Sequence, residues 1–152
     1  MAIFDDLEGQ YNSIDNQYAT GEFQASRSGA TRKEAEFRKK REINDQAYFL
    51  FMFSRLEDRV NQEAEKLIKR KTTSRASWKQ KAPWDNLPKE VKDIPFKNRL
   101  ALLAERGKQD FNLISDYYLE RNSIAHGGGF KRPINMPDAI ANFIRLYKAI
   151  RA

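Results

Sequence analysis

Cysteine is absent from this chain of 152 residues, and histidine occurs once, at His126. The absence of cysteine excludes disulfides, thiolate chemistry and cysteine zinc sites, and it fits a reducing compartment. With a single histidine, a zinc site built within one chain would have to rely on carboxylates, which is unusual. We therefore expect neither a metal nor a cofactor.

Long apolar runs are absent as well. The longest, residues 47–53, is far too short to span a bilayer. The first residues lack the basic and apolar regions of a signal peptide. Apolar residues make up 40% of the chain and charged residues 32%, which suits a globular helical protein better than a disordered one. We expect a cytoplasmic protein with no membrane partner.

Charge is unevenly distributed. The net charge is +7, although residues 1–30 hold five acids and only one base. The rest of the chain is therefore strongly basic, which favours partners that carry phosphate. The alternative is that the excess of positive charge only keeps the surface soluble.

Apolar residues recur at three- and four-residue steps, which predicts helices. The stripe that begins the chain contains Phe4, Leu7, Tyr11, Ile14 and Tyr18. A break of small residues is expected over residues 21–29, and Thr31 should begin a long helix that reaches about Arg70. The seam of the long helix comprises Phe49, Phe53, Leu56, Val60, Ala64 and Leu67. Because apolar residues surround the helix over residues 47–53, that part should be buried in the core or in an oligomer.

Three further helices are expected, over 96 to about 106, over 110 to about 126, and from 137 onward. Residues 72–95 contain three prolines and should form a connection with at most a short turn around 87–91. There is no internal repeat and no clear domain boundary. The prediction is an all-α fold, a helical bundle of about five helices with one long helix, forming a single domain over residues 1–152.

Polar residues gather at the end of the helix predicted to finish near His126. Arg121 lies five residues before His126, and Asn122 lies four before it. On an ideal helix the three side chains span about 140° of arc. Imidazole can act as an acid or a base near neutral pH, which makes His126 a candidate catalytic group. The alternative is structural, because a histidine followed by glycine can simply cap a helix against its dipole.

The string Tyr117-Tyr118-Leu119-Glu120-Arg121-Asn122-Ser123-Ile124-Ala125-His126-Gly127 resembles the signature of the HEPN superfamily. Members of that superfamily are α-helical bundles with an Arg, an adjacent polar residue and a following His. Many are metal-independent ribonucleases, including toxins of toxin–antitoxin systems and antiviral effectors, and others lack nuclease activity. The resemblance implies that Arg121, Asn122 and His126 are catalytic. It also implies a homodimer with a composite active site, and an antitoxin or regulatory protein as a possible partner.

The chemistry of RNA cleavage agrees with these residue types. The 2′-hydroxyl of RNA can attack the adjacent phosphorus, so the enzyme has to supply a base, an acid and positive charge. Arginine offers permanent bidentate charge to phosphate oxygens, and Asn122 could orient the imidazole or donate to the phosphate. The expected products carry a 2′,3′-cyclic phosphate and a 5′-hydroxyl. Two proton transfers need two titrating groups, which again favours a dimer.

Basic residues elsewhere suggest where RNA is bound. Residues 66–81 contain seven bases and no acid, with Trp78 among them. Cations interleaved with an aromatic ring suit single-stranded RNA, including the loops of tRNA. The residues that we expect to bind RNA are Lys69, Arg70, Lys71, Arg75, Trp78 and Lys79, together with Lys131 and Arg132 after the glycines. We expect Trp84 to pin its loop to the bundle.

Two further interpretations remain open. Glu120 is a candidate extra acid or base, with a solvated carboxylate at the helix end as the alternative. For the whole chain, the competing function is a non-catalytic HEPN-like domain, or another basic helical protein, that binds RNA or a partner protein.

Overall fold

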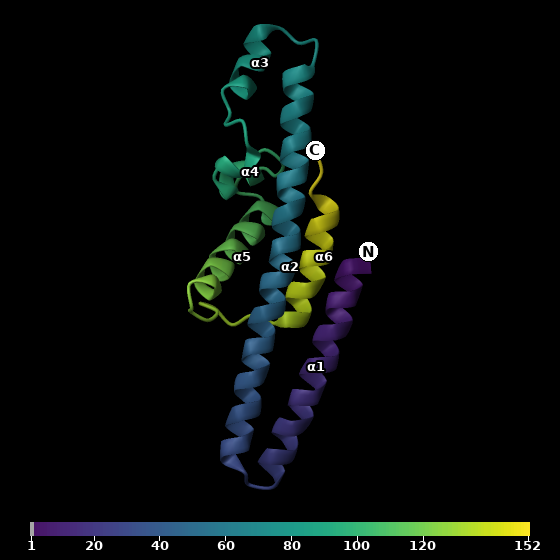
Figure 1. The fold of residues 1–152 in the computed structure, drawn as a ribbon, viewed down its shortest axis with the longest axis vertical. Coiled ribbons are helices and arrows are strands. Elements are labelled where there is room, and N and C mark those ends of the chain that lie inside the picture. Colours follow the sequence, from purple (N-terminus) through teal and green to yellow (C-terminus); the bar gives the residue numbers. More distant parts are fainter. Residues whose placement is uncertain (1) are drawn as a thin grey trace. The chain divides into compact units, whose positions relative to one another are not determined.

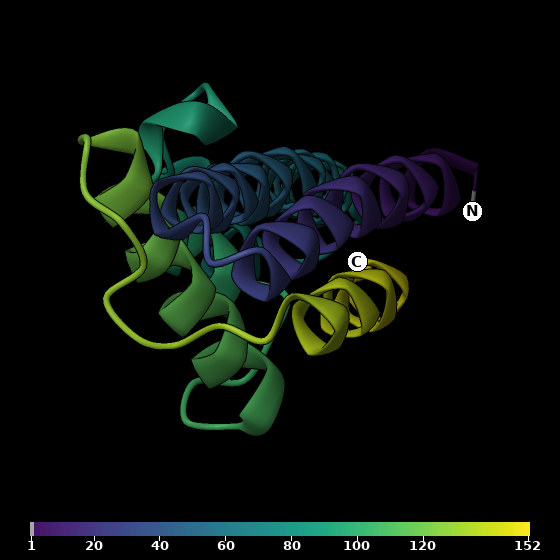
Figure 2. The same ribbon diagram turned by 90° about the horizontal axis from the view of Figure 1, so that it is seen from below.

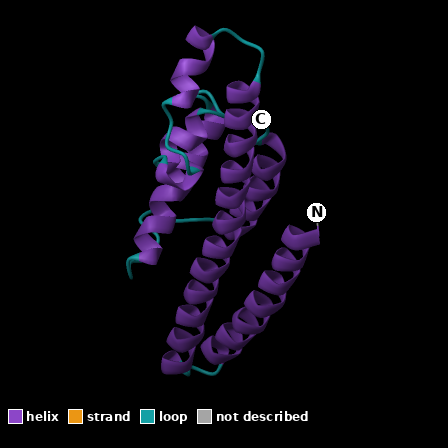
Figure 3. Ribbon diagram, turned by 45° about the horizontal axis from the view of Figure 1, so that its top comes forward, coloured by secondary structure: helices purple, strands orange, loops and turns teal. Residues whose placement is uncertain are grey.

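Helices form all the regular secondary structure in the described part of the chain. The computed structural model describes residues 2–152, and it contains no strand within that range (Figure 3). The helices are α1 (Ala2–Arg27), α2 (Thr31–Thr73), α3 (Trp78–Asp85), α4 (Phe96–Ala101), α5 (Gln109–Ala125) and α6 (Met136–Ala149), with a short 3₁₀ helix, η1, at Val91–Asp93. The predicted all-α fold with one long helix is confirmed. Among the helices of residues 2–152, none combines the length and the apolar composition that crossing a bilayer requires.

The chain divides into two compact units. Unit 1 comprises the chain up to Phe53 together with Glu120–Ile144. Unit 2 comprises Ser54–Leu119 together with Arg145–Ala152. Helices α2, α5 and α6 contribute residues to both units. The single domain over residues 1–152 stays a prediction.

In unit 1, α1 lies antiparallel beside the first part of α2 (Figures 1 and 2). Tyr11 of α1 meets Tyr48 of α2 edge to face, with ring centroids 5.7 Å apart. On another side of α2, Phe49 is fully buried and contacts the rings of Phe130 and Phe143, each at 5.2 Å between centroids. Aromatic rings therefore join α2 to α1, to the loop after α5 and to α6.

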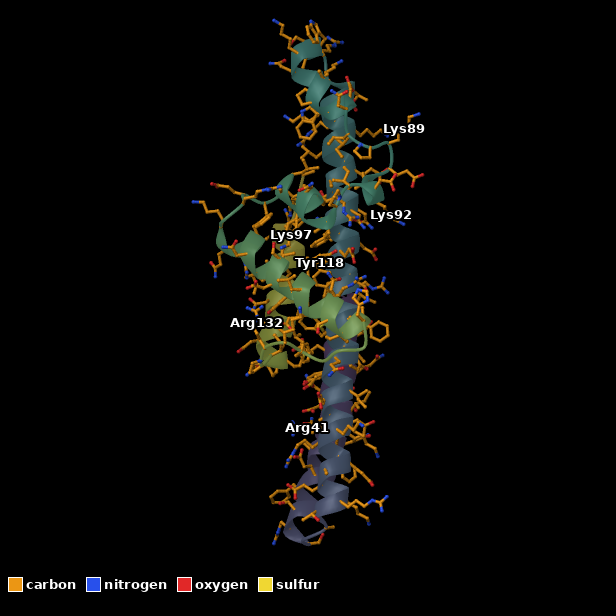
Figure 4. The ribbon with its side chains drawn as sticks, turned by 90° about the vertical axis from the view of Figure 1, so that its left-hand side faces the viewer. Arg41, Lys89, Lys92, Lys97, Tyr118 and Arg132 are labelled. Carbon is orange, nitrogen blue, oxygen red and sulfur yellow. The ribbon has the colours of Figure 1, made fainter. Side chains whose placement is uncertain are left out.

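The acidic first helix neutralises part of the basic start of α2. Arg41 donates to Asp15 at 2.9 Å and to Glu22 at 3.1 Å, and Arg38 pairs with Glu22 at 3.2 Å. The hydrogen bond from Arg41 is the main reason that the pKa of Glu22 lies below its ordinary value. This part of α2 is a paired, charged face, and Figure 4 labels Arg41 on it.

The predicted break over residues 21–29 is mostly wrong, because α1 continues to Arg27 and only a short turn follows. Gly29 makes that turn with a φ of 71°, a conformation that favours glycine. Gly21 lies inside the helix, where a β-carbon would overlap the ring of Phe37 on α2. Gly21 therefore allows the two helices to approach and does not end α1.

In unit 2, the second part of α2 carries the remainder of the predicted seam, from Leu56 to Leu67. Leu56, Val60 and Ala64 are fully buried, which confirms their expected place in the core. Tyr118 of α5 stacks on Phe96 of α4, with ring centroids 4.6 Å apart. Figure 4 labels Tyr118 on α5 and Lys97, which follows Phe96 on α4.

Two predictions were wrong, one about the connection and one about the end of the helix that follows it. Residues 72–95 contain a helix, α3, and the short helix η1, rather than a single turn. At the start of α3, the backbone nitrogen of Ser77 donates to the side-chain oxygen of Gln80 at 3.3 Å, which stabilises the first turn. Pro83 lies late in this short helix and interrupts few backbone hydrogen bonds. Helix α4 ends at Ala101, several residues before the predicted end near 106.

Candidate active site

The end of α5 is shaped by a glycine turn. Gly127 has a φ of 82°, and its backbone nitrogen donates to the carbonyl of Ile124 at 3.0 Å. The nitrogen of Gly128 donates to the carbonyl of Ser123 at 2.9 Å. These two bonds form a Schellman motif, in which the left-handed residue is usually glycine. Helix α5 therefore ends at Ala125, with His126 between the helix and the turn, close to the end near His126 that the sequence predicts.

His126 lies at the junction between the helix and this turn. Its backbone nitrogen donates to the carbonyl of Asn122 at 3.1 Å, which continues the helical hydrogen bonding by one residue. Its side chain is exposed. An exposed imidazole at a helix end is accessible to a substrate.

Arg121 and Asn122 are both half-buried and are joined directly. The Nη1 atom of Arg121 donates to the Oδ1 atom of Asn122 at 3.0 Å. This bond holds the amide oxygen of Asn122 toward Arg121, and its Nδ2 group supplies hydrogen-bond donors. The pair therefore combines a permanent positive charge with an oriented donor on the last turns of α5.

Glu120 ties the following loop to the helix. Its side chain is buried, with 1% of its surface exposed. One carboxylate oxygen accepts the backbone N–H of Lys131 at 2.6 Å, and the other accepts Nε of Arg132 at 3.1 Å. The expectation of a solvated carboxylate was wrong, because the chain folds back after the glycines and supplies two donors. A buried carboxylate requires such partners.

The loop after α5 thus returns to the end of the helix. Ser123 Oγ donates to the carbonyl of Gly129 at 2.8 Å, which adds a second link between helix and loop. Lys131 and Arg132 are both exposed, and Figure 4 labels Arg132. The site residues predicted in unit 1 therefore lie on α5 and on the segment that follows it: Arg121 and Asn122 on the helix, His126 directly after its last residue, and Lys131 and Arg132 on the loop.

The other predicted RNA-binding residues lie in unit 2. The last turns of α2 carry Lys69, Arg70 and Lys71, all of them exposed. Arg75 is exposed in the connection, and α3 begins with Trp78 and Lys79. Trp78 has 73% of its surface exposed, and Lys79 Nζ lies 6.0 Å from the centre of its ring. These residues belong to unit 2, whereas Arg121, Asn122 and His126 belong to unit 1.

Comparisons with protein-family models, with curated proteins and with solved structures give no match to this chain. Within the described residues, no group of three or more His, Asp or Glu side chains is placed to hold a metal ion. The class of substrate that the site suits is therefore inferred from its side chains. An exposed imidazole, a guanidinium and an amide donor suit a phosphodiester substrate.

Sequence reasoning missed the role of Glu120. A signal was available, because an acidic side chain in the packed part of an apolar helix needs a partner of opposite charge. Lys131 and Arg132, which follow three glycines, are the nearest cations after it on the next segment of the chain. The sequence pattern does not indicate which of the two residues pairs with Glu120 through its side chain. Only Arg132 does so, because Lys131 donates from its backbone nitrogen.

Proposed function

We propose that this chain is a metal-independent endoribonuclease of the HEPN type. The observation that carries the proposal is the arrangement at the end of α5, where Arg121 is bonded to Asn122 and the imidazole of His126 is exposed one turn later. The loop bonded to Glu120 adds Lys131 and Arg132 to the same unit. These residues supply a proton-exchanging group and several positive charges, which RNA cleavage requires.

The proposed reaction is an internal transfer of the phosphate. One imidazole removes the proton of the 2′-hydroxyl, and the 2′-oxygen then forms a bond to phosphorus. The bond from phosphorus to the 5′-oxygen breaks, and a second imidazole gives that oxygen its proton. Arg121 and the Nδ2 group of Asn122 stabilise the negative charge that builds up on the phosphorane. The products carry a 2′,3′-cyclic phosphate and a 5′-hydroxyl, and no metal takes part.

This scheme uses two imidazoles, whereas each chain has one. A two-fold dimer would bring both copies of His126, Arg121 and Asn122 into one composite site. Two exposed apolar side chains of unit 1 support this proposal. On the part of α2 in unit 1, Ile43 and Phe51 have 56% and 61% of their surfaces exposed. Large apolar side chains left this exposed are candidates for burial against another chain, and we assign this part of α2 to contact with a second copy of the chain.

The proposed substrate is RNA in single-stranded regions, with tRNA as one candidate, contacted in part by the basic residues at the end of α2. A toxin or antiviral defence effector would fit this activity, and such a protein would be held in check by an antitoxin or regulatory partner. The second candidate is a non-catalytic RNA-binding or adaptor domain. It is favoured by the exposure of His126, because a catalytic imidazole is usually oriented by a neighbouring group.

The test is cleavage of total RNA in EDTA by the wild type and by His126→Ala. Lys148→Ala, an exposed residue at the end of α6, is the control. We expect the wild type and the control to cleave RNA, and we expect His126→Ala to lose at least about 100-fold in rate, since positioned acid–base groups contribute that much. Circular dichroism must show the same helix content for all three. Equal cleavage by His126→Ala would overturn the proposal.

A further inference from the structure

A cavity of about 370 Å³ lies in unit 2, where α3 turns back toward the end of α2. Its size is in the lower part of the range for small-ligand pockets, about 300–1,000 Å³. It is lined by Arg70, Lys71, Ser74, Ala76, Gln80 and Trp84. None of these described lining residues is acidic. A role of Trp84 in pinning its loop to the bundle would not require a cavity beside its ring.

The local sequence builds this cavity. Helix α2 ends at Thr73, and a short connection leads to Ser77, whose bond to Gln80 starts α3. Trp84 then comes to lie near Lys71, with the ammonium 5.9 Å from the centre of the indole ring. Trp84 is half-buried, so its ring is held in the wall of the cavity while part of it stays accessible.

The lining groups share a chemical preference. Arg70 and Lys71 are exposed cations at the rim, suited to a phosphate. The side-chain oxygen of Gln80 accepts the backbone N–H of Ser77, which leaves its Nε2 group as a donor to a ligand. The indole ring of Trp84 offers a flat surface for stacking. A phosphate joined to a planar base combines the two features that this lining would bind.

We propose that this cavity binds one nucleotide of a single-stranded RNA, with its base against Trp84 and its phosphate at Arg70 and Lys71. The inference rests on the proposed function only in taking RNA as the ligand. It assigns a binding subsite to residues of unit 2, none of which takes part in the proposed reaction.

A strand of RNA fits better than a free nucleotide because the same features continue beyond the cavity. Trp78, at the start of α3, has 73% of its surface exposed, and Lys79 lies 6.0 Å from its ring centre. A second ring with its own cation is what the neighbouring nucleotide of a strand would use. Lys69 and Arg75 add exposed charge close in sequence to the residues that line the cavity.

The experiment measures binding of a labelled single-stranded RNA oligonucleotide by full-length chain carrying His126→Gln, so that the RNA stays intact. In that background, Arg70→Gln with Lys71→Gln is compared with Lys33→Gln and Lys39→Gln. Both double variants remove the same charge from exposed positions on α2. We expect about tenfold weaker binding from the cavity pair and a change of at most about twofold from the control pair. The slope of log affinity against log salt should fall by about 0.7 for each phosphate that the variant no longer binds.

Trp84 separates base stacking from simple attraction of charge. Trp84→Ala should weaken binding about tenfold, and Trp84→Phe should restore most of it, because stacking on an aromatic ring supports each bound base. If Trp84→Ala is not folded, as judged by thermal unfolding, Trp84→Leu takes its place. Equal binding of duplex and single-stranded RNA, or full affinity without an aromatic ring at this position, would overturn the proposal.

One comparison distinguishes a strand of RNA from a free nucleotide as the ligand. A second distinguishes failure of the cavity proposal from failure of the proposed function. Free adenosine monophosphate should compete weakly with the oligonucleotide, and competition at equal nucleotide concentration would make a small nucleotide the ligand and overturn the assignment to RNA. Cleavage of RNA by the His126-containing chain, with no effect of the cavity variants on binding or KM, would overturn this inference alone. Binding at the cavity without cleavage would overturn only the proposed function.

Discussion

The buried carboxylate of Glu120 accepts a hydrogen bond from Nε of Arg132 at 3.1 Å. The two residues are twelve positions apart in the sequence, and the glycine turn lies between them. The same carboxylate accepts the backbone N–H of Lys131 at 2.6 Å. One side chain of α5 thereby fixes the course of the loop that carries both cations. The end of α5 and the loop are joined through this carboxylate, and we expect the link to contribute measurably to the free energy of unfolding.

Glu120→Ala should lower the free energy of unfolding by about 2–3 kcal/mol, because it removes charge-assisted hydrogen bonds and leaves a cavity. Urea denaturation followed by circular dichroism measures the change. The control is Glu105→Ala, which removes an exposed carboxylate whose distance to Lys108 is 4.0 Å and should cost less than about 0.5 kcal/mol. Equal effects of the two substitutions would show that the Glu120 bonds do not hold the loop.

Glu63 should make unit 2 less stable in acid. Its carboxylate is buried, and the hydrogen bond from Lys66 at 2.7 Å, followed by that from the backbone of Ala152, lowers the pKa of Glu63 below 4.5. A group whose folded pKa is lowered contributes stability that is present above the unfolded value and is lost as pH falls through the folded value.

Glu63→Gln should therefore be less stable than the wild type at pH 7, and the difference should shrink steadily once the pH falls below about 4.5. Denaturation curves at several pH values measure this. Glu65→Gln, which removes an exposed carboxylate on the same helix, is the control. A difference between Glu63→Gln and wild type that is constant from pH 7 to acid would contradict the account.

The two glycines within α1 provide a matched test of helix packing. A β-carbon at Gly9 would meet nothing within 4 Å, whereas one at Gly21 would overlap the ring of Phe37. Gly9→Ala should stabilise the protein by about 0.5–1 kcal/mol through helix propensity. Gly21→Ala should lack that gain and destabilise by about 1 kcal/mol or more, as overpacking does. Thermal or urea unfolding of both variants decides, and equal stabilisation would mean that Phe37 moves without cost.

Phe51 should support the proposed dimer, and Phe23 provides its control. Both residues lie in unit 1 with 61% of their surfaces exposed, Phe51 on α2 and Phe23 on α1. Phe51→Glu should weaken the dimer at least about tenfold, which corresponds to about 1.4 kcal/mol, since it places a charge in an apolar contact. Phe23→Glu should leave it intact. Sedimentation equilibrium measures both, and a wild type that is monomeric at all concentrations would rule out the composite site.

Periodicity predicted the parts of the fold in which apolar spacing is uninterrupted. The seam from Phe49 to Leu67 has the expected spacing, and all its members are buried. The exposure of Phe51 was less predictable, because an apolar run does not reveal which of its sides is covered within one chain. Helix α3 was missed because Pro83 and the neighbouring prolines suggested a loop, while the capping interaction between Ser77 and Gln80 depends on a single pair of residues.

The candidate site was predictable in composition and not in geometry. Gly127 indicated the end of α5 because a left-handed turn favours glycine. The bond between Arg121 and Asn122 joins sequence neighbours whose side chains could equally have faced other partners. Glu120 and its loop depend on where the chain returns after three glycines, and local pattern does not encode that return.

The most direct test of the central claim is the chemistry of the RNA ends formed in EDTA. Wild-type protein should yield 5′-hydroxyl ends, which polynucleotide kinase labels without prior phosphatase treatment, and 2′,3′-cyclic phosphate ends. His126→Gln, which keeps a polar side chain but cannot exchange a proton near neutral pH, should yield neither. Cleavage to 5′-phosphate ends, or the same products from His126→Gln, would contradict attack by the 2′-hydroxyl with His126 as the acid–base group.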